Sequence, residues 1–427
     1  MNEDKNKPHG LGIGFKAEVF DNVNGELIPV QTTEENGSKL EAYINIKNEK
    51  TGKEAELPMR SFVQTFLTVL YRYFTGSDNA TDAYTRNRSV SYQAITSTLA
   101  SGASKKGLLC GTGITGVTLS DVGLETPLAH ASLAYGNVTF VPPYISDVTT
   151  KTMKFEVRRM LTSVRATTTY ITELIVKTRA AFANETASGG ASAVNLKPLT
   201  ISRDLLANSV DNSEGLTRGD GIPVNQDEGI AFQFKFKLSQ VTTGANQGGA
   251  VLNFVKMIYN QLFKGNPNGA VLLDDNGSNL AITYANGTFA SDASTGNPFH
   301  VADTVTNYGI LVGIYDKPAG SDYYNPPINC DDYKFEVKTT GLTIGATEVA
   351  AITNPSKANT AQFIVSRTFT NSGVTTLKLN RAGLKIKGDA FIAINTLAEP
   401  SDNQTGNYLA LQPNQVLKVS YPFEVQA

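Results

Sequence analysis

The chain of 427 residues contains no tryptophan, only two cysteines and only three histidines. Cys110 and Cys330 are too few for a disulfide framework, and we expect both to be ordinary buried thiols. His9, His130 and His300 lie far apart, so no two of them share the spacing of a zinc motif. Neither G-x-S-x-G nor H-E-x-x-H occurs. These absences predict a protein that is not an enzyme, with no catalytic, cofactor-binding or metal-binding residues and no cofactor.

Charge and long apolar runs are scarce as well. Charged residues make up 18% of the chain, and 37 basic against 39 acidic residues leave a net charge of -2. Electrostatic binding of nucleic acid by the whole chain needs a concentrated excess of basic residues. We therefore expect the protein not to bind DNA, which at most passes through the lumen of its assembly. The most hydrophobic run, residues 61–74, includes Gln64 and Arg72 and is too short to span a bilayer. With a polar N-terminus, the sequence predicts folding in a cytoplasm and no membrane partner.

What the chain does contain favours β-structure. It has 37 glycines and many Thr, Asn and Ser residues. Thr is enriched in strands, and Gly, Asn and Ser are frequent in turns. We therefore expect sheets joined by many turns rather than a helical bundle.

A diverged internal repeat runs along the chain. Residues 155–162 (FEVRRMLT) match residues 363–370 (FIVSRTFT) in their Phe, Val, Arg and Thr, and both alternate apolar and polar residues as a half-buried strand does. Three further pairs of segments follow in the same order: 170–177 with 377–387, 200–206 with 391–397, and 230–238 with 415–425. The shared order predicts two copies of one module.

Each copy also begins with a helical pattern. Residues 66–74 (FLTVLYRYF) resemble residues 254–262 (FVKMIYNQL) in their apolar spacing, and Gly76 and Gly265 follow them. We place the join near residue 240, in the polar, Gly-rich residues 240–249. The predicted fold is mainly β, with two tandem β-sandwich or jelly-roll-like modules, residues 1–240 and 241–427. Each module has one short helix and long irregular loops.

One glycine motif resembles a nucleotide-binding fingerprint. Residues 111–116 (GTGITG) match G-x-G-x-x-G, but a dinucleotide site needs a helix to begin at this point. Residues 117–120 (VTLS) instead read as a continuing β-type run. We interpret the motif as a Gly-rich turn.

The remaining charged residues give no catalytic set. The acidic pairs at 274–275 and 331–332 are typical of solvated turns, and spacing alone does not identify a glycosidase pair. Arg158, Arg159, Arg165 and Arg179 form a modest basic edge, but alternate residues of a strand face opposite sides. At most half of them can therefore face one partner. The long segments 180–198, 207–229 and 264–307 lack periodicity, which favours loops ordered by neighbouring subunits.

Residues 111–128 (GTGITGVTLSDVGLETPL) resemble a segment of tailed-phage virion proteins, in which G-T-G-x-T-x-V-T-x-x-D precedes Thr-Pro. Residues 363–373, 382–384, 201–206 and 61–71 resemble further elements of these proteins. The family includes neck, ring, collar and tail proteins, also of crAss-like phages of gut Bacteroides, and implies β-sandwich modules. The second copy departs from the pattern, with residues 313–318 (GIYDKP) in the equivalent place.

This resemblance implies a structural virion protein, assembled in the bacterial cytoplasm, that forms a ring or sleeve in the neck or tail. Its partners would be copies of itself in a cyclic ring of six- or twelve-fold symmetry and other neck, tail or portal proteins. It would adapt one layer of the particle to the next around the DNA conduit. The alternative is a fibre or spike module that binds a host-surface glycan or receptor, for which residues 322–325 (DYYN) are the best candidate loop. A tail-associated glycan hydrolase and a secreted surface protein are further alternatives.

Overall fold

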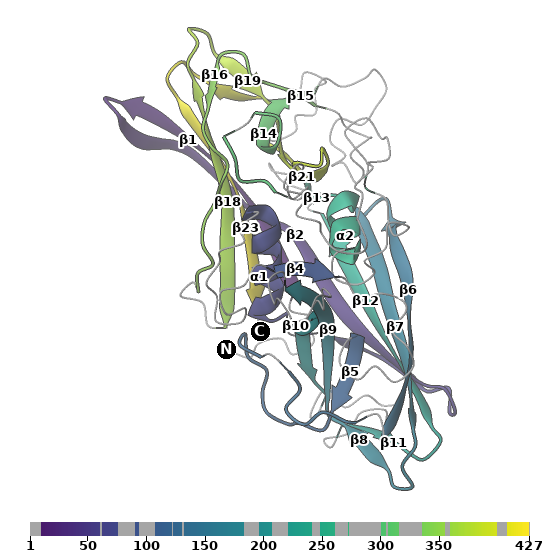
Figure 1. The fold of residues 1–427 in the computed structure, drawn as a ribbon. Coiled ribbons are helices and arrows are strands. Elements are labelled where there is room, and N and C mark those ends of the chain that lie inside the picture. The colour runs from purple at the N-terminus through teal and green to yellow at the C-terminus, as the bar shows by residue number, and fades with distance from the viewer. Residues whose placement is uncertain are drawn as a thin grey trace, which may run out of the picture.

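The structure is a computed structural model of the whole chain (Figure 1). It describes residues 10–59, 62–75, 90–93, 107–121, 123–129, 132–182, 196–206, 221–240, 248–260, 272, 300–304, 306–315, 335–354, 359–398 and 408–426. The predicted long segments 180–198, 207–229 and 264–307, and most of the join at 240–249, lie largely outside these residues. So do His9, His130, Cys330, the acidic pairs and residues 322–325.

A ten-stranded antiparallel sheet runs through the whole molecule. Its main path has the order β16-β18-β23-β1-β2-β12-β7-β6, with β17 paired to β18 and β3 paired to β2. The strands are β1 (Gly10–Val23), β2 (Glu26–Asn48), β3 (Glu54–Pro58), β6 (Leu133–Asp147), β7 (Thr152–Ser163), β12 (Gly229–Ser239), β16 (Leu342–Ile344), β17 (Glu348–Val349), β18 (Thr360–Asn371) and β23 (Val416–Gln426).

Smaller sheets and two helices pack against this sheet. One small sheet contains β4 (Val90–Gln93), β5 (Gly107–Gly111), β9 (Glu173–Phe182) and β10 (Leu196–Leu205). Another contains β13 (Gly248–Ala250), β14 (Gly309–Ile314), β15 (Glu336–Val337), β20 (Arg381–Lys385) and β21 (Phe391–Thr396). Two short pairs join β8 (Thr169–Ile171) to β11 (Ile222–Val224) and β19 (Leu377–Leu379) to β22 (Leu409–Leu411). The described helices are α1 (Gln64–Thr75) and α2 (Leu252–Ile258).

The prediction of a mainly β protein is confirmed. Along β7, β12, β18 and β23, one residue in two is buried, and these inward side chains belong to one continuous core. The alternation follows because successive side chains of a strand point to opposite faces. Phe155 stacks on Phe236 with ring centroids 4.4 Å apart, and Phe363 stacks on Phe423 at 4.9 Å. The large sheet thus has one face toward the core and one charged face toward solvent.

The two segments that carry the repeat occupy corresponding places in the sheet. Residues 155–162 lie in β7, which pairs with β12, and residues 363–370 lie in β18, which pairs with β23. The register agrees, because Phe155 is opposite Phe236 in one pair and Phe363 is opposite Phe423 in the other. The order β6-β7-β12-β2 from one edge mirrors β16-β18-β23-β1 from the other. The two halves therefore meet where β1 pairs with β2.

Each half also repeats the small sheet and its connections. Strands β5, β9 and β10 are neighbours in the first half, as β14, β20 and β21 are in the second. The residue segments 170–177 and 377–387, each expected to be one strand, are in fact divided. The first divides at Thr172, between β8 and β9, and the second at Asn380, between β19 and β20. The Thr172 hydroxyl donates to the Gly113 carbonyl, and Asn380 bonds the main chain of Tyr315, so a polar side chain holds each division.

The helices connect the two halves. Helix α1 packs against β10 of its own half but also against β18 and β23, while α2 packs against β21 and also against β6 and β7. Aromatic rings make both contacts: Tyr71 meets Phe363 edge-on at 5.7 Å, and Tyr259 meets Phe155 edge-on at 5.6 Å. In Figure 1 both helices lie on the same face of the large sheet. Each helix therefore covers sheet residues from the opposite half.

Candidate functional site

The Gly-rich segment after β5 forms a folded loop rather than a nucleotide cradle. No helix begins within residues 112–121, as the sequence predicts, but the expected strand at 117–120 is wrong. These residues form turns because their polar groups bond to one another. The Thr118 N–H and hydroxyl both donate to the carboxylate of Asp121, at 3.1 and 2.8 Å. Such side-chain bonds to nearby backbone compete with strand pairing.

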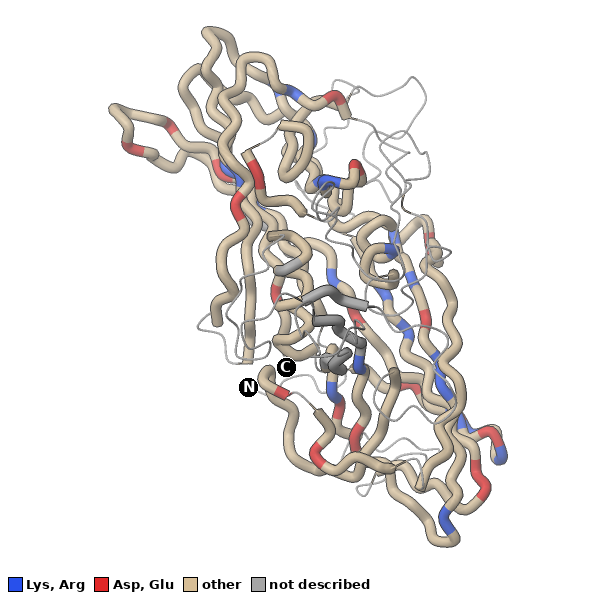
Figure 2. Tube along the Cα trace, in the orientation of Figure 1, with Lys and Arg blue, Asp and Glu red and all other residues tan. Residues whose placement is uncertain are grey.

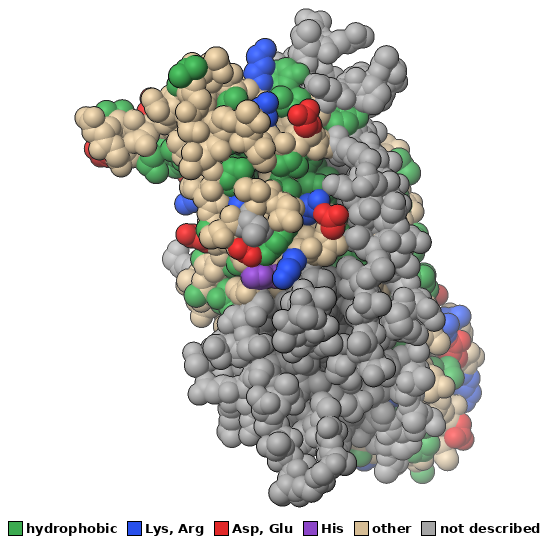
Figure 3. Space-filling model, turned by 45° about the horizontal axis from the view of Figure 1, so that its top comes forward, with side chains coloured by type: hydrophobic (Ala, Val, Ile, Leu, Met, Phe, Trp, Pro, Cys, Tyr) green, Lys and Arg blue, Asp and Glu red, His purple; other side chains and the backbone are tan. Residues whose placement is uncertain are grey.

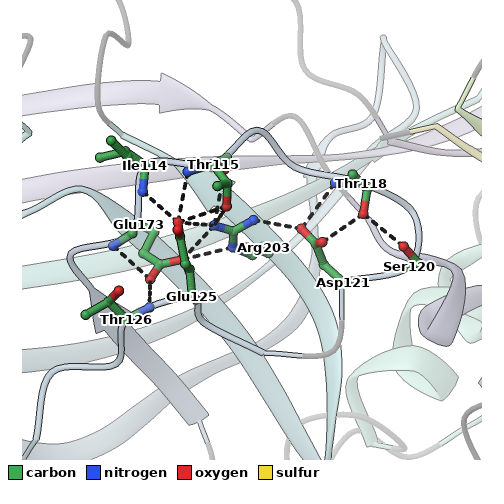
Figure 4. Close-up of polar contacts among 10 residues, drawn as sticks. Ile114, Thr115, Thr118, Ser120, Asp121, Glu125, Thr126, Glu173 and Arg203 are labelled. Atoms are coloured by element: carbon green, nitrogen blue, oxygen red, sulfur yellow. Dashed lines mark hydrogen bonds and ion pairs between the residues drawn. The ribbon is translucent and has the colours of Figure 1, made fainter.

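A buried ion-pair cluster holds this loop (Figure 4). Arg203 reaches it from β10, and Glu173 is the first residue of β9. Nε and Nη2 of Arg203 lie 2.9 and 2.8 Å from Oε2 of Glu173, and Nη1 lies 2.9 Å from Oδ2 of Asp121. Glu173 is fully buried and Arg203 nearly so. Buried charges of this kind are tolerated only when they are paired and hydrogen-bonded.

The N–H groups of the loop are bonded to carboxylates. Glu173 accepts from the N–H groups of Gly113, Glu125 and Thr126 at 3.0 to 3.1 Å. Glu125 accepts from the N–H groups of Ile114 and Thr115, both at 2.9 Å. A phosphate would need these same donors. The geometry therefore favours a structural role for the motif.

The charges of the cluster support one another. Burial lowers the pKa of Arg203, but its bonds to Asp121 and Glu173 outweigh burial and raise the pKa above its ordinary value. The pKa of Glu125 lies below its ordinary value of 4.5, mainly because the N–H and the hydroxyl of Thr115 donate hydrogen bonds to its carboxylate. The guanidinium and the Glu125 carboxylate therefore remain charged at neutral pH.

Two glycines of the motif, Gly111 and Gly113, leave room for the close approach of Glu173. A Cβ on Gly113 would lie 2.6 Å from the Glu173 carboxylate, whereas a Cβ on Gly116 would meet nothing within 4 Å. We therefore expect Gly113→Ala to lower the free energy of unfolding by about 1–3 kcal/mol, the usual effect of overpacking. The matched variant Gly116→Ala should change it by less than about 0.5 kcal/mol. Urea denaturation measures both, and equal effects would contradict this role for Gly113.

The loop is also expected to loosen in acid. The folded-state pKa of Glu125 lies below the ordinary 4.5, so its stabilising bonds are complete above that pH and are lost as pH falls through the lowered value. Hydrogen exchange at Ile114 and Thr115, corrected for intrinsic rates, should be constant from pH 8 to 5 and rise only below about 4.5. Glu125→Gln should remove this dependence, because an amide does not titrate there. Protection that persists unchanged to pH 3 would show that Glu125 does not close the loop.

The corresponding place in the second half carries the opposite charge. Gly111 is opposite Glu173 where β5 pairs with β9, and Gly313 is opposite Arg381 where β14 pairs with β20. Gly313 begins residues 313–318, which the predicted repeat aligns with the Gly-rich motif. Arg381 is buried and lies over the ring of Tyr315, 5.2 Å from its centroid. The ion-pair cluster thus belongs to the first half alone among the described residues.

The other candidates within the described residues are buried or partly buried side chains. Cys110 is buried, as expected, and burial raises the pKa of its thiol to about 12. His300 lies three residues before Asp303, and burial lowers its pKa more than Asp303 raises it. Asp303 accepts a hydrogen bond from the hydroxyl of Tyr308. No group of three or more His, Cys, Asp or Glu residues that could hold a metal occurs in the described part of the chain.

The basic edge divides between the two faces of β7, as alternation predicts. Arg158 is exposed and pairs with Glu49 at 2.6 Å. Arg159 is fully buried: its Nε donates to the Gly136 carbonyl at 2.9 Å and its Nη1 to the Leu108 carbonyl at 3.0 Å. Arg367 of β18 repeats this arrangement, with bonds from Nε to Gly345 and from Nη1 to Ile310. Each buried arginine therefore bonds the large sheet to a small sheet.

Sequence reasoning did not single out Glu173, Glu125 or Arg203. A signal was present, because Glu173 and Arg203 interrupt the apolar strands ITELIV and TISRDLL. A charge at an inward strand position indicates a buried partner. Which partner it has depends on the pairing of β9 with β10, which no local pattern specifies.

Comparisons with protein-family models, with curated proteins and with solved structures find no match to this chain. Neither described helix has the length and apolar character required to cross a membrane.

Proposed function

We propose that this chain is a structural protein of a tailed-phage particle. In this proposal it forms an oligomeric ring or sleeve in the neck or tail, and adapts one layer of the particle to the next around the DNA conduit. The observation that carries the proposal is the continuous sheet with its two corresponding halves and mutually packed helices. A continuous sheet shared by both halves suits a protein that carries load between distant surfaces. The resemblance of residues 111–128 to virion proteins supports the same proposal.

The proposal includes two β-sandwich-like modules, residues 1–240 and 241–427, that share the large sheet, except that β1 lies on the side of the second module. Their support is the matching register around Phe155 and Phe363 and the two buried arginines, Arg159 and Arg367. Loss of either arginine would leave one half of the molecule without its side-chain bonds between the large sheet and a small sheet. The partners in this proposal are further copies of the chain and other neck, tail or portal proteins, with DNA at most in the lumen.

The chemistry of the described site supports a mechanical rather than a catalytic role. The carboxylates of Glu173 and Asp121 bond to Arg203 and to backbone N–H groups. A general acid or base must instead be able to reach a substrate proton. The cluster serves to fix a loop beside the small sheet, and we assign it no step of a reaction.

The test is electron microscopy of the purified chain together with mass photometry. The proposal expects closed rings with a central opening, of six or twelve subunits, at micromolar concentration. Hydrogen exchange should also show residues 180–229 and 264–307 better protected in the ring than in a dissociated subunit. A chain that stays monomeric over the whole concentration range, alone and with its particle proteins, would contradict the proposal.

A further inference from the structure

A β-hairpin projects from the body of the molecule. We call residues 20–32, the end of β1 and the start of β2, the arm. Strand β23 pairs with β1 only as far as Phe20, and β12 pairs with β2 only from Lys39 onward. At its base Phe20 still pairs with Val416, and the Asp21 carboxylate accepts from the Gln415 side chain at 2.8 Å. Beyond these residues no further described strand pairs with the arm, and Figure 1 shows it standing away from the body at the upper left.

The arm has a well-defined turn. Asn24 and Gly25 both have positive φ, 57° and 89°, which is the signature of a type I′ turn. The N–H of Gly25 also donates to the side chain of Asn22 at 3.0 Å. The two-residue turn fixes the register of the strands, so opposite residues share one face.

One face of the arm combines apolar and acidic residues. Val23 is opposite Glu26 and Asp21 is opposite Ile28, so these four side chains share a face. Leu27 lies on the other face, opposite Asn22, and Val30 is the unpaired residue at a register shift between Pro29 and Gln31. Val23, Ile28 and Val30 are 45 to 54% exposed. Residues 17–35 contain five acidic residues and no Lys or Arg. In Figure 2 the projecting part shows red but no blue, and Figure 3 shows apolar side chains on its surface.

The solvent face of the large sheet offers a complementary surface. Lys154 of β7 lies directly opposite Lys237 of β12, and Tyr144 of β6 lies opposite Lys154 on the same face. On its other side Lys237 lies opposite Glu41 of β2, whereas Lys154 has no acidic residue directly opposite it. Tyr144 and the neighbouring Val141 are about 40% exposed. Lys154 helps to lower the pKa of Asp147, but neither lysine has an ion pair within 4 Å among the described residues. Like charges directly opposite each other destabilise a sheet.

We infer that the arm of one copy binds the β6–β7–β12 face of a second copy. Glu26 pairs with Lys154 and Lys237, and supplies the acidic partner that Lys154 lacks within its own chain among the residues directly opposite it. Val23 and Ile28 pack on Val141 and Tyr144. Two features favour a second copy: the arm's acids complement these lysines, and its exposed apolar side chains find an apolar counterpart next to them.

The contact joins different surfaces of the two copies. The arm leaves the sheet near its middle strands, and the acceptor face lies at the β6 edge. Made head to tail, this contact leaves one arm and one acceptor free at the ends and continues into a ring or a filament, whereas a reciprocal exchange of arms would close a two-fold dimer. The proposed ring requires the head-to-tail arrangement, and mass photometry distinguishes it from the dimer. The inference rests on the self-association in the proposed function, and specifies the surface that produces it.

Charge reversal in the full-length chain tests the contact by mass photometry and analytical ultracentrifugation. Glu26→Lys alone, and Lys154→Glu with Lys237→Glu alone, should each weaken assembly on the order of 100-fold, because like charges then face each other. An equimolar mixture of the two proteins should assemble again, since each arm then finds an acceptor of opposite charge. The control Lys378→Glu with Lys387→Glu makes the same charge change at two exposed lysines outside the proposed contact and should assemble normally.

Each other result rejects the inference in a distinct way. Assembly that persists in both reversed proteins would show that another surface joins the copies, and the proposed ring would stand. Loss of assembly in each variant without recovery in the mixture would show that these charges do not face each other. A wild-type chain that is monomeric at all concentrations would overturn both the arm contact and the proposed ring.

Discussion

Replacing Arg159 by alanine is expected to lower the free energy of unfolding by about 3–5 kcal/mol. The guanidinium is fully buried, donates to the carbonyls of Gly136 and Leu108, and lies over the ring of Tyr135, 4.7 Å from its centroid. Its removal leaves buried carbonyls without these donors, at about 1–3 kcal/mol each, and opens a cavity between two sheets. Urea denaturation followed by circular dichroism measures the change.

Arg158 gives a matched control on the same strand. It is exposed, and its ion pair with Glu49 is a surface pair, so Arg158→Ala should cost less than about 1 kcal/mol. Arg367→Ala should reproduce the large effect of Arg159→Ala, because Arg367 makes the corresponding bonds in the second half. Similar losses for Arg158→Ala and Arg159→Ala would refute the assignment of the buried arginine as the link between sheets.

The second large effect is expected at the ion-pair cluster. Arg203→Ala should lower the free energy of unfolding by about 3–5 kcal/mol, because it leaves the buried carboxylate of Glu173 without its cation. The loop at Gly113 should lose protection from hydrogen exchange at the same time, since Glu173 holds its N–H group.

A double variant separates the charge effect from lost packing. Glu173→Gln in the Arg203→Ala background removes the uncompensated charge but keeps an acceptor for the loop, so it should recover part of the stability. If Glu173→Gln instead lowers the stability of the Arg203→Ala protein further, the buried carboxylate is not the origin of the loss. Denaturation of the two single variants and the double variant completes the cycle.

Much of the fold follows from local patterns in the sequence. The alternation in residues 155–162 and 363–370 predicts β7 and β18, and the apolar spacing of residues 66–74 predicts α1. The register of β7 against β12 also corresponds to the register of β18 against β23, which is consistent with the repeat. These elements are predictable because burial of one face imposes a period on the side chains.

The arrangement of these elements in space could not be predicted from local sequence patterns. The pairing of β1 with β23 joins residues about 400 positions apart, and the packing of α1 on β18 crosses between the halves. Local periodicity gives no information on such contacts. The arm was also not predicted, because its exposed valines and isoleucine resemble those of an ordinary half-buried strand.

The site shows the same limit. The glycines at 111 and 113 mark a close backbone approach, but the approaching group is the Glu173 carboxylate, some sixty residues later. Thr118 and Asp121 could be expected to form a local turn, since they are three residues apart. Arg203 joins both parts only because β10 pairs with β9. The sequence therefore indicates which residues are unusual, and the pairing of the strands determines which partners these residues have.

The mirrored strand order and the crossed helices give the large sheet and its helices an approximate two-fold arrangement within a single chain. In a true homodimer, any substitution occurs twice and alters both equivalent positions together. Here each position is encoded separately, so one half can carry Glu173 while the other carries Arg381 at the corresponding place. The two halves therefore differ in charge at this place, while the buried arginines Arg159 and Arg367 occupy equivalent positions in both.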